Sequence, residues 1–320
     1  MRSLEEELED ARRKYRNWGR WGDDDALGAL NFIDDAARVR AAALARTGRT
    51  FSLAQEYNRD GPQTGAHGRG NPVHTMIESG LDAAADVQGF GHGYGGADDV
   101  LFLPLQSGTR WDGLGHVFDS KKAWNGRDCD EAVTGAGDRI TGIERQAAAF
   151  VGRGVLLDVG RAYGADEELP DGFAITEEHL AGTIAAQGPG SAVGRGDLVL
   201  VRTGQLARCR RRAAWGGYAN GAAPGLSFGT LDWLHRTEIA AAATDTACFE
   251  VRPYEFAEHC HRPLHQVAIP NLGLPLGEMF DLEELAAHCA GDGVYEFLLA
   301  AGPLPVTGAV AGPVNPIAVK

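Results

Sequence analysis

Short apolar runs bounded by glycine recur in the second half of this chain and predict buried strands. Residues 152 to 160 (GRGVLLDVG) and 196 to 204 (GDLVLVRTG) are the clearest of these runs. Between them, residues 175 to 188 begin with a threonine and two glutamates and continue with apolar residues at helical spacing, which predicts a helix. The order strand, helix, strand indicates a parallel pair of strands in an α/β sheet.

Other segments carry similar patterns. Residues 239 to 251 predict a third buried strand, and residues 294 to 306 predict a closing strand. Residues 281 to 293 predict a helix with Asp281 as its N-cap. Residues 3 to 16 predict a helix whose early acidic and late basic residues complement the helix dipole.

A glycine-rich stretch, residues 61 to 99, interrupts this alternation and predicts a long irregular segment before the apolar run VLFLPL. Loops of this length usually carry function or line a pocket. Its sequence GFGHGYGG follows no predicted strand and precedes no predicted helix, so a dinucleotide-binding loop is not indicated. Three histidines of this stretch are expected to be solvated, namely His67, His74 and His92.

Charge and composition narrow the class of protein. The net charge of −14 and the pI near 5.1 argue against nucleic acid and against an anionic membrane surface as partners. We find no apolar run of membrane-spanning length and no secretory signal, and we therefore expect a cytoplasmic protein. The five cysteines form no C-x-x-C pair and are expected to be reduced thiols, including Cys260 between two histidines.

The densest chemistry lies in QSGTRWDGLGH, residues 106 to 116. If this segment enters a strand and then a glycine-bent turn, then Gln106, Arg110 and Asp112 share one face. An amide, a guanidinium and a carboxylate on one face, followed by the imidazole of His116, are typical of a polar site.

This segment resembles the signature of the cyclase-like metal-dependent hydrolases, the family of bacterial kynurenine formamidase and isatin hydrolase, whose pattern is H-x-G-T-H-x-D-x-P-x-H. Similarity to the longer members of that family extends over nearly the whole chain, through NWGRWGDDDALGALNFI, ATDTACFEVRP, LHQVAIPNLGLPLGEMFDLEEL and GPVNPIAV. The resemblance implies a swivelling β/β/α fold, in which a mixed sheet curls into a partial barrel with flanking helices. It also implies one domain over residues 1 to 320 and a homodimer or higher oligomer, in which residues 1 to 30 could be an arm that embraces a neighbour.

The resemblance also assigns roles to individual residues. It implies that Asp112, His265 and Glu278 hold a divalent metal, Mn or Zn, and that His116 moves protons. The two histidines that complete the family's metal site are replaced here by Gln106 and Arg110. The amide of Gln106 is a weak but acceptable ligand for a hard ion, whereas the guanidinium of Arg110 has no lone pair to give.

Three hypotheses for the function follow from this pattern. The first is hydrolysis of a carbon–nitrogen bond in an amide or cyclic amide, with a metal held by Asp112, His265, Glu278 and Gln106. The second is a metal-independent cyclase, dehydratase or isomerase of secondary metabolism, without a cofactor, in which Arg110 replaces the ion and His116 or Glu278 is the base. The third is a non-catalytic protein that binds a small acid. It also stays open that Arg110 only forms an ion pair with Asp112, in a site that has lost its activity.

Aromatic residues near the predicted site segments favour an aromatic or cyclic carbonyl compound as the small-molecule substrate. These residues are Trp18, Trp21, Phe90, Tyr94, Trp111 and Phe118.

Overall fold

The computed structural model describes residues 4 to 256 and 261 to 320, so Cys260 and its neighbour His259 lie outside the described residues. Within the described part, nine strands form one mixed sheet that curls into a half-barrel, in the order β1-β15-β13-β7-β9-β11-β12-β4-β14. The strands are β1 (Thr50–Ser52), β4 (Arg110–Asp112), β7 (Val151–Asp158), β9 (Leu198–Arg202), β11 (Ala241–Thr244), β12 (Leu276–Glu278), β13 (Glu296–Ala300), β14 (Ala311–Pro313) and β15 (Ile317–Val319).

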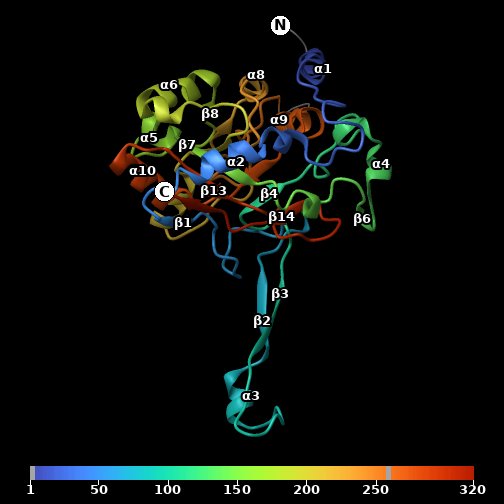
Figure 1. Cartoon of the computed structure of the whole chain (residues 1–320), viewed down its shortest axis with the longest axis vertical. Helices are drawn as coiled ribbons and strands as arrows, with labels where there is room; N and C mark the ends of the chain where they lie inside the picture. Colours follow the sequence, from blue (N-terminus) through green and yellow to red (C-terminus); the bar gives the residue numbers. More distant parts are fainter. Residues whose placement is uncertain (1–3, 257–260) are drawn as a thin grey trace.

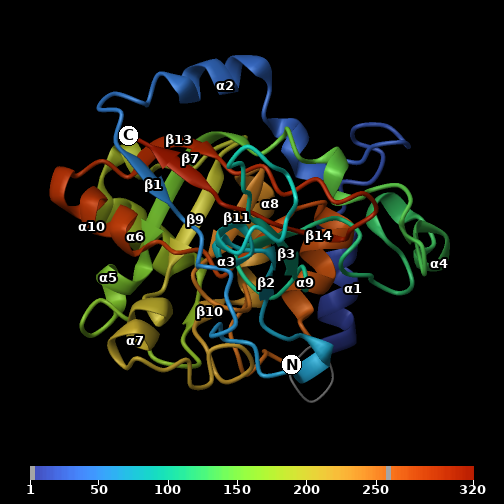
Figure 2. The ribbon, with the colours of Figure 1, turned by 90° about the horizontal axis from the view of Figure 1, so that it is seen from below.

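Helices flank this sheet, and three small two-stranded sheets complete the described structure (Figure 2). The α-helices are α1 (Leu4–Lys14), α2 (Asp35–Ala42), α3 (Gly80–Ala84), α4 (Cys129–Ala132), α5 (Val159–Tyr163), α6 (Glu177–Gln187), α7 (Gln205–Arg211), α8 (Leu231–Arg236), α9 (Pro263–Val267) and α10 (Glu283–Asp292). Single turns lie at η1 (Gly28–Phe32), η2 (Ala66–Gly68), η3 (Trp124–Gly126), η4 (Ile143–Arg145), η5 (Pro189–Ser191), η6 (Phe228–Thr230) and η7 (Ala268–Leu272). The small sheets pair β2 (Val73–Glu78) with β3 (Asp98–Phe102), β5 (Val133–Thr134) with β6 (Gly137–Asp138), and β8 (Ala174–Ile175) with β10 (Gly225–Leu226).

The centre of the sheet is buried on both faces, which explains the unbroken apolar runs in the sequence. Along β7, Val155 and Leu157 join one core, and Leu156 between them joins the other. The strands β7 and β9 are parallel neighbours, with the helix α6 between them in the chain. The predicted mixed sheet with flanking helices and the predicted parallel pair are therefore confirmed.

Two predicted elements differ in extent from the observed ones. The third strand ends at Thr244 and not near residue 251, because the carboxylate of Asp245 accepts hydrogen bonds of 2.8 Å from the backbone of Thr203 and Gly204. The last helix begins at Glu283 after Leu282. The predicted N-cap, Asp281, accepts a long 3.5 Å hydrogen bond from the backbone N–H of Glu283 and is bound mainly by the guanidinium of Arg210. In both places a carboxylate is bound by a distant part of the chain.

The glycine-rich stretch, residues 61 to 99, is predicted to be irregular, but part of it forms regular structure. Its residues 73 to 78 form β2, which pairs with β3 to make a hairpin that extends away from the body of the molecule, with α3 near its far end (Figure 1). We call this hairpin, residues 73 to 102, the arm; it is distinct from the N-terminal segment, residues 1 to 30, that is expected to embrace a neighbour. The pairing joins residues 20 to 29 positions apart, and the local pattern of the sequence carries no sign of it. On the arm, His74 is exposed beside Asp99 and His92 is exposed, as expected for solvated histidines.

The N-terminal helix α1 packs on the body of its own chain. Its Leu8 and Ala11 belong to the core, and both carboxylate oxygens of Asp119 accept a 2.9 Å hydrogen bond from the Arg12 side chain. The same carboxylate accepts hydrogen bonds from Gln266 (2.8 Å) and Asn271 (2.9 Å). One buried carboxylate therefore joins α1, the loop after β4 and the segment around α9. That residues 1 to 30 embrace a neighbouring molecule stays a prediction.

Candidate active site

The strand β4 lies between β12 and β14 and supplies the first two site residues. Arg110 and Asp112 are two positions apart on this strand and therefore point to the same face. Glu278 on β12 is the direct cross-strand partner of Arg110, so its side chain reaches that face too. Gln106 lies in a turn before the strand, is partly exposed and forms no hydrogen bond with any described residue. That it shares the face of Arg110 and Asp112, or binds a metal, stays a prediction.

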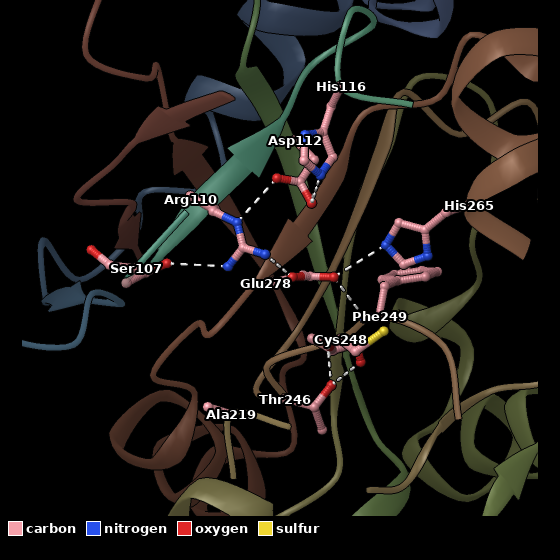
Figure 3. Close-up of polar contacts among 12 residues, drawn as sticks. Ser107, Arg110, Asp112, His116, Ala219, Thr246, Cys248, Phe249, His265 and Glu278 are labelled. Atoms are coloured by element: carbon pink, nitrogen blue, oxygen red, sulfur yellow. Dashed lines mark hydrogen bonds and ion pairs between the residues drawn. The ribbon is translucent and has the colours of Figure 1, made fainter. Parts of the chain in front are cut away.

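The guanidinium of Arg110 is bound between two carboxylates (Figure 3). Its Nε donates to Oδ1 of Asp112 at 3.0 Å, and its Nη2 donates to Oε2 of Glu278. All three side chains are buried, at 1%, 0% and 0% exposure. Burial alone would lower the pKa of Arg110, but the charges of Asp112 and Glu278 outweigh it and raise that pKa. The guanidinium is therefore a permanent buried cation.

Sequence reasoning missed Glu250, which positions His265. The carboxylate of Glu250 accepts hydrogen bonds of 3.1 Å from the backbone N–H groups of Leu264 and His265 in the first turn of α9. It thus satisfies donors that a helix N-terminus leaves free. The same carboxylate contacts Nδ1 of His265 at 2.5 Å, while Nε2 of His265 contacts Oε1 of Glu278 at 3.1 Å. The thirteen-residue gap between His265 and Glu278 is closed as predicted.

Two carboxylates, one at each ring nitrogen, determine the charge of His265. Burial lowers the pKa of this imidazole, but hydrogen bonds to Glu250 and Glu278 outweigh burial and raise the pKa to about 9. Burial acts to raise the pKa of Glu278, but the charge of Arg110 and the contact with His265 hold it well below its usual range. Arg110, Glu278, His265 and Glu250 therefore form a continuous chain of alternating charges.

His116 reaches the other oxygen of Asp112. A turn in which its backbone N–H donates to the carbonyl of Gly113 at 3.0 Å brings Nε2 of His116 to 3.7 Å from Oδ2 of Asp112. That turn needs glycine at position 115, where a Cβ would lie 2.0 Å from a carboxylate oxygen of Asp138. Burial lowers the pKa of His116 despite the nearby Asp112, so its imidazole is neutral at pH 7. Oδ2 of Asp112 is buried and has no hydrogen-bond partner, and this orphaned acceptor faces the imidazole.

The buried thiol of Cys248 completes a candidate metal cluster that the sequence did not reveal. Ligand atoms of Cys248, His265 and Glu278 lie within 4.8 Å of one another, so these three groups could hold an ion. An ion bound jointly by Asp112 and Glu278, as the resemblance implies, does not fit the observed arrangement, because the guanidinium of Arg110 already bonds both carboxylates and offers no lone pair.

Three of the six aromatic residues named from the sequence lie away from this site. Trp111 is fully buried and stacks on Phe150, with ring centroids 4.6 Å apart. Phe90 and Tyr94 lie exposed on the arm. Trp111 is therefore a core residue, and none of these three supports an aromatic substrate.

The charge of His265 predicts how stability depends on pH. Because its pKa is raised on folding, the contribution of this group is complete below pH 6.5 and is lost as pH rises towards 9, by on the order of 3 kcal/mol. Urea denaturation of the protein in EDTA at pH 6 to 9 measures this loss. His265→Gln should reduce the change in the free energy of unfolding between pH 6 and 9, whereas His74→Gln on the exposed arm should leave that change as in the wild type. An equal change with pH in the wild type and in His265→Gln would contradict the assignment.

Comparisons with known proteins identify the family and the fold. The sequence model of the Cyclase family matches residues 42 to 251. A crystal structure of a protein described as a novel cyclase is 39% identical, over 97% of this chain and 99% of that chain, with a TM-score of 0.86. Comparison with curated protein sequences gives no significant match.

Two isatin hydrolases share the fold at lower identity. Isatin hydrolase A from Labrenzia aggregata is 19% identical over 85% of this chain and 94% of that chain, with a TM-score of 0.61. Isatin hydrolase A from Ralstonia solanacearum is 17% identical over 89% of this chain and 97% of that chain, also with a TM-score of 0.61. With two thirds of its length matched by the family's sequence model, this chain belongs to the cyclase family.

Proposed function

We propose that this protein is an enzyme that transfers protons on a small carbonyl compound without a metal ion, and that Arg110 supplies the positive charge of the site. The observation that carries the proposal is the bonding of one buried guanidinium to both Asp112 and Glu278. A fixed cation in a buried site stabilises negative charge that develops on a reacting oxygen, without reorganisation during the reaction.

The guanidinium retains one donor group for this role. Nε and Nη2 are taken by the two carboxylates, but Nη1 makes only a long contact of 3.5 Å with the carbonyl of Gly108. A substrate oxygen is a stronger partner for that N–H than a distant peptide carbonyl. Arg110 therefore acts as an oxyanion donor and its two carboxylates hold the guanidinium plane in place.

His116 is the acid–base group of this proposal. With its proton on Nε2, next to the free oxygen of Asp112, the imidazole has a lone pair on Nδ1 that can accept a proton from substrate. Asp112 stabilises the imidazolium that forms, as carboxylates do beside catalytic histidines. Glu278 is a poor base, because Arg110 and His265 hold it ionised with a low pKa.

This combination favours cyclisation, dehydration or isomerisation over hydrolysis of an unactivated amide. Each of these reactions needs a base and a polarised carbonyl, and none needs a strong hydroxide nucleophile. A guanidinium does not lower the pKa of water as a zinc ion does, to about 7.

A second candidate function is hydrolysis of a carbon–nitrogen bond with Mn or Zn. The proximity of Cys248, His265 and Glu278 favours it, and so do the isatin hydrolases among the structural relatives. A protein that binds its ligand without turnover is the third candidate, and the two experiments below separate all three.

Metal binding distinguishes the first two candidates. If the metal-free mechanism holds, addition of Zn²⁺ or Mn²⁺ should leave the thermal midpoint of the wild type unchanged, since Arg110 bonds both Asp112 and Glu278. A rise in the midpoint would instead favour an ion held by Cys248, His265 and Glu278. Arg110→His returns a ligand to the family's position and should gain a metal-dependent rise of several degrees, which Arg46→His on the surface should not. A full equivalent of metal in the purified wild type, or activity abolished by EDTA, would sink the metal-free mechanism.

Removal of the proposed acid–base group distinguishes an enzyme from a binding protein. His116→Gln should lower kcat at least about a hundredfold, a typical contribution of general acid–base catalysis. Isatin and related cyclic carbonyl compounds are suitable probes, and unfolding curves check that the variant is folded. Unchanged turnover in His116→Gln, with His74→Gln as the matched control, would exclude the assigned role.

A further inference from the structure

A polar cavity lies near the cluster of Cys248, His265 and Glu278 and is not used by the mechanism above. It has a volume of about 290 Å³ and is lined by Asn220, Gly221, Ala222, Arg252, Pro253, Tyr254, His261 and Arg262. Two of these residues are arginines and none is acidic. This is unusual in a chain whose net charge is −14, where most buried cations are paired with carboxylates.

Arg252 is a buried cation that forms no ion pair with any residue of the described part of the chain. It is 6% exposed, and its Nη1 and Nη2 donate to the backbone carbonyls of Ala219 (2.7 Å) and Tyr218 (2.8 Å). Its Nε has no hydrogen-bond partner and is fully buried. A buried N–H without a partner costs free energy, and a buried charge without its opposite costs more, so this arrangement is that of a site whose ligand supplies the missing acceptor.

Arg262 connects the cavity to the candidate active site. Its Nε donates to the hydroxyl oxygen of Tyr254 at 3.2 Å, and it forms no ion pair with any described residue. The thiol of Cys248 lies 3.8 Å from the same hydroxyl, and Cys248 belongs to the cluster with Glu278. The charge of Arg262 acts to lower the pKa of Arg110, and the carboxylate of Glu278 acts to raise the pKa of Arg262.

We propose that this cavity binds the carboxylate of a small organic acid. The free donors are Nε of Arg252 and both terminal nitrogens of Arg262, and such forks match the two oxygens of a carboxylate. Pro253 and Ala222 supply apolar contact for the carbon skeleton, and a cavity of roughly 150 Å³ already admits benzene. If the proposed function holds, the acid is part of the substrate, and its carboxylate fixes the carbonyl relative to Arg110 and His116.

Titration calorimetry with benzoate and benzamide tests this site without any turnover. The two probes have nearly the same shape and differ in charge, so the wild type should bind benzoate at least tenfold more tightly than benzamide. Arg262→Gln should lower the benzoate affinity at least tenfold and leave the benzamide affinity unchanged, and the surface variant Arg46→Gln should behave as the wild type. His116→Gln should retain benzoate binding, which separates failure of this site from failure of the proposed reaction.

Three outcomes would overturn the proposal: equal affinities for benzoate and benzamide, benzoate binding that survives Arg262→Gln, or a clear preference for inorganic phosphate over benzoate. Because Arg252 also holds two backbone carbonyls, its variants are more prone to unfold. Arg262, which is bound only to Tyr254, therefore carries the test.

Discussion

The constraint on which this structure depends is that a buried guanidinium must keep both of its carboxylates. Arg110 sits on a strand with neighbours on each side, so its charge cannot move towards water. Desolvation of one cation costs several kcal/mol, and only close opposite charges repay it. The charges of Asp112 and Glu278 offset this cost. Their side chains are thereby held in place, so that Asp112 contacts His116 and Glu278 contacts His265.

The same logic separates two kinds of arginine in this protein. Arg12, Arg110 and Arg202 are buried beside carboxylates and hold parts of the fold together. Arg252 and Arg262 line a cavity, and neither forms an ion pair within residues 4 to 256 and 261 to 320. A cation whose opposite charge belongs to the protein stabilises the structure, whereas one without it is available to a ligand.

Much of the fold was accessible from sequence, because its signals are local. The runs around residues 155 and 200 predicted β7 and β9, since a strand buried on both faces has to be apolar throughout. The segment QSGTRWDGLGH located Arg110, Asp112 and His116, and the family resemblance supplied His265 and Glu278. Glu250, Cys248 and the arm escaped prediction because each depends on contacts between distant parts of the chain, as does the loss of Asp281 to Arg210.

Asp119 has a consequence for how this sequence can change over time. Its carboxylate lies three residues after His116 and accepts hydrogen bonds from the side chains at positions 12, 266 and 271, the last two of which follow His265 in the chain. A replacement of Asp119 removes an acceptor that these three side chains share. Positions 12, 119, 266 and 271 are therefore expected to vary together among related chains. Through them, an N-terminal helix that is far from the site in sequence constrains the spacing of His116 and His265.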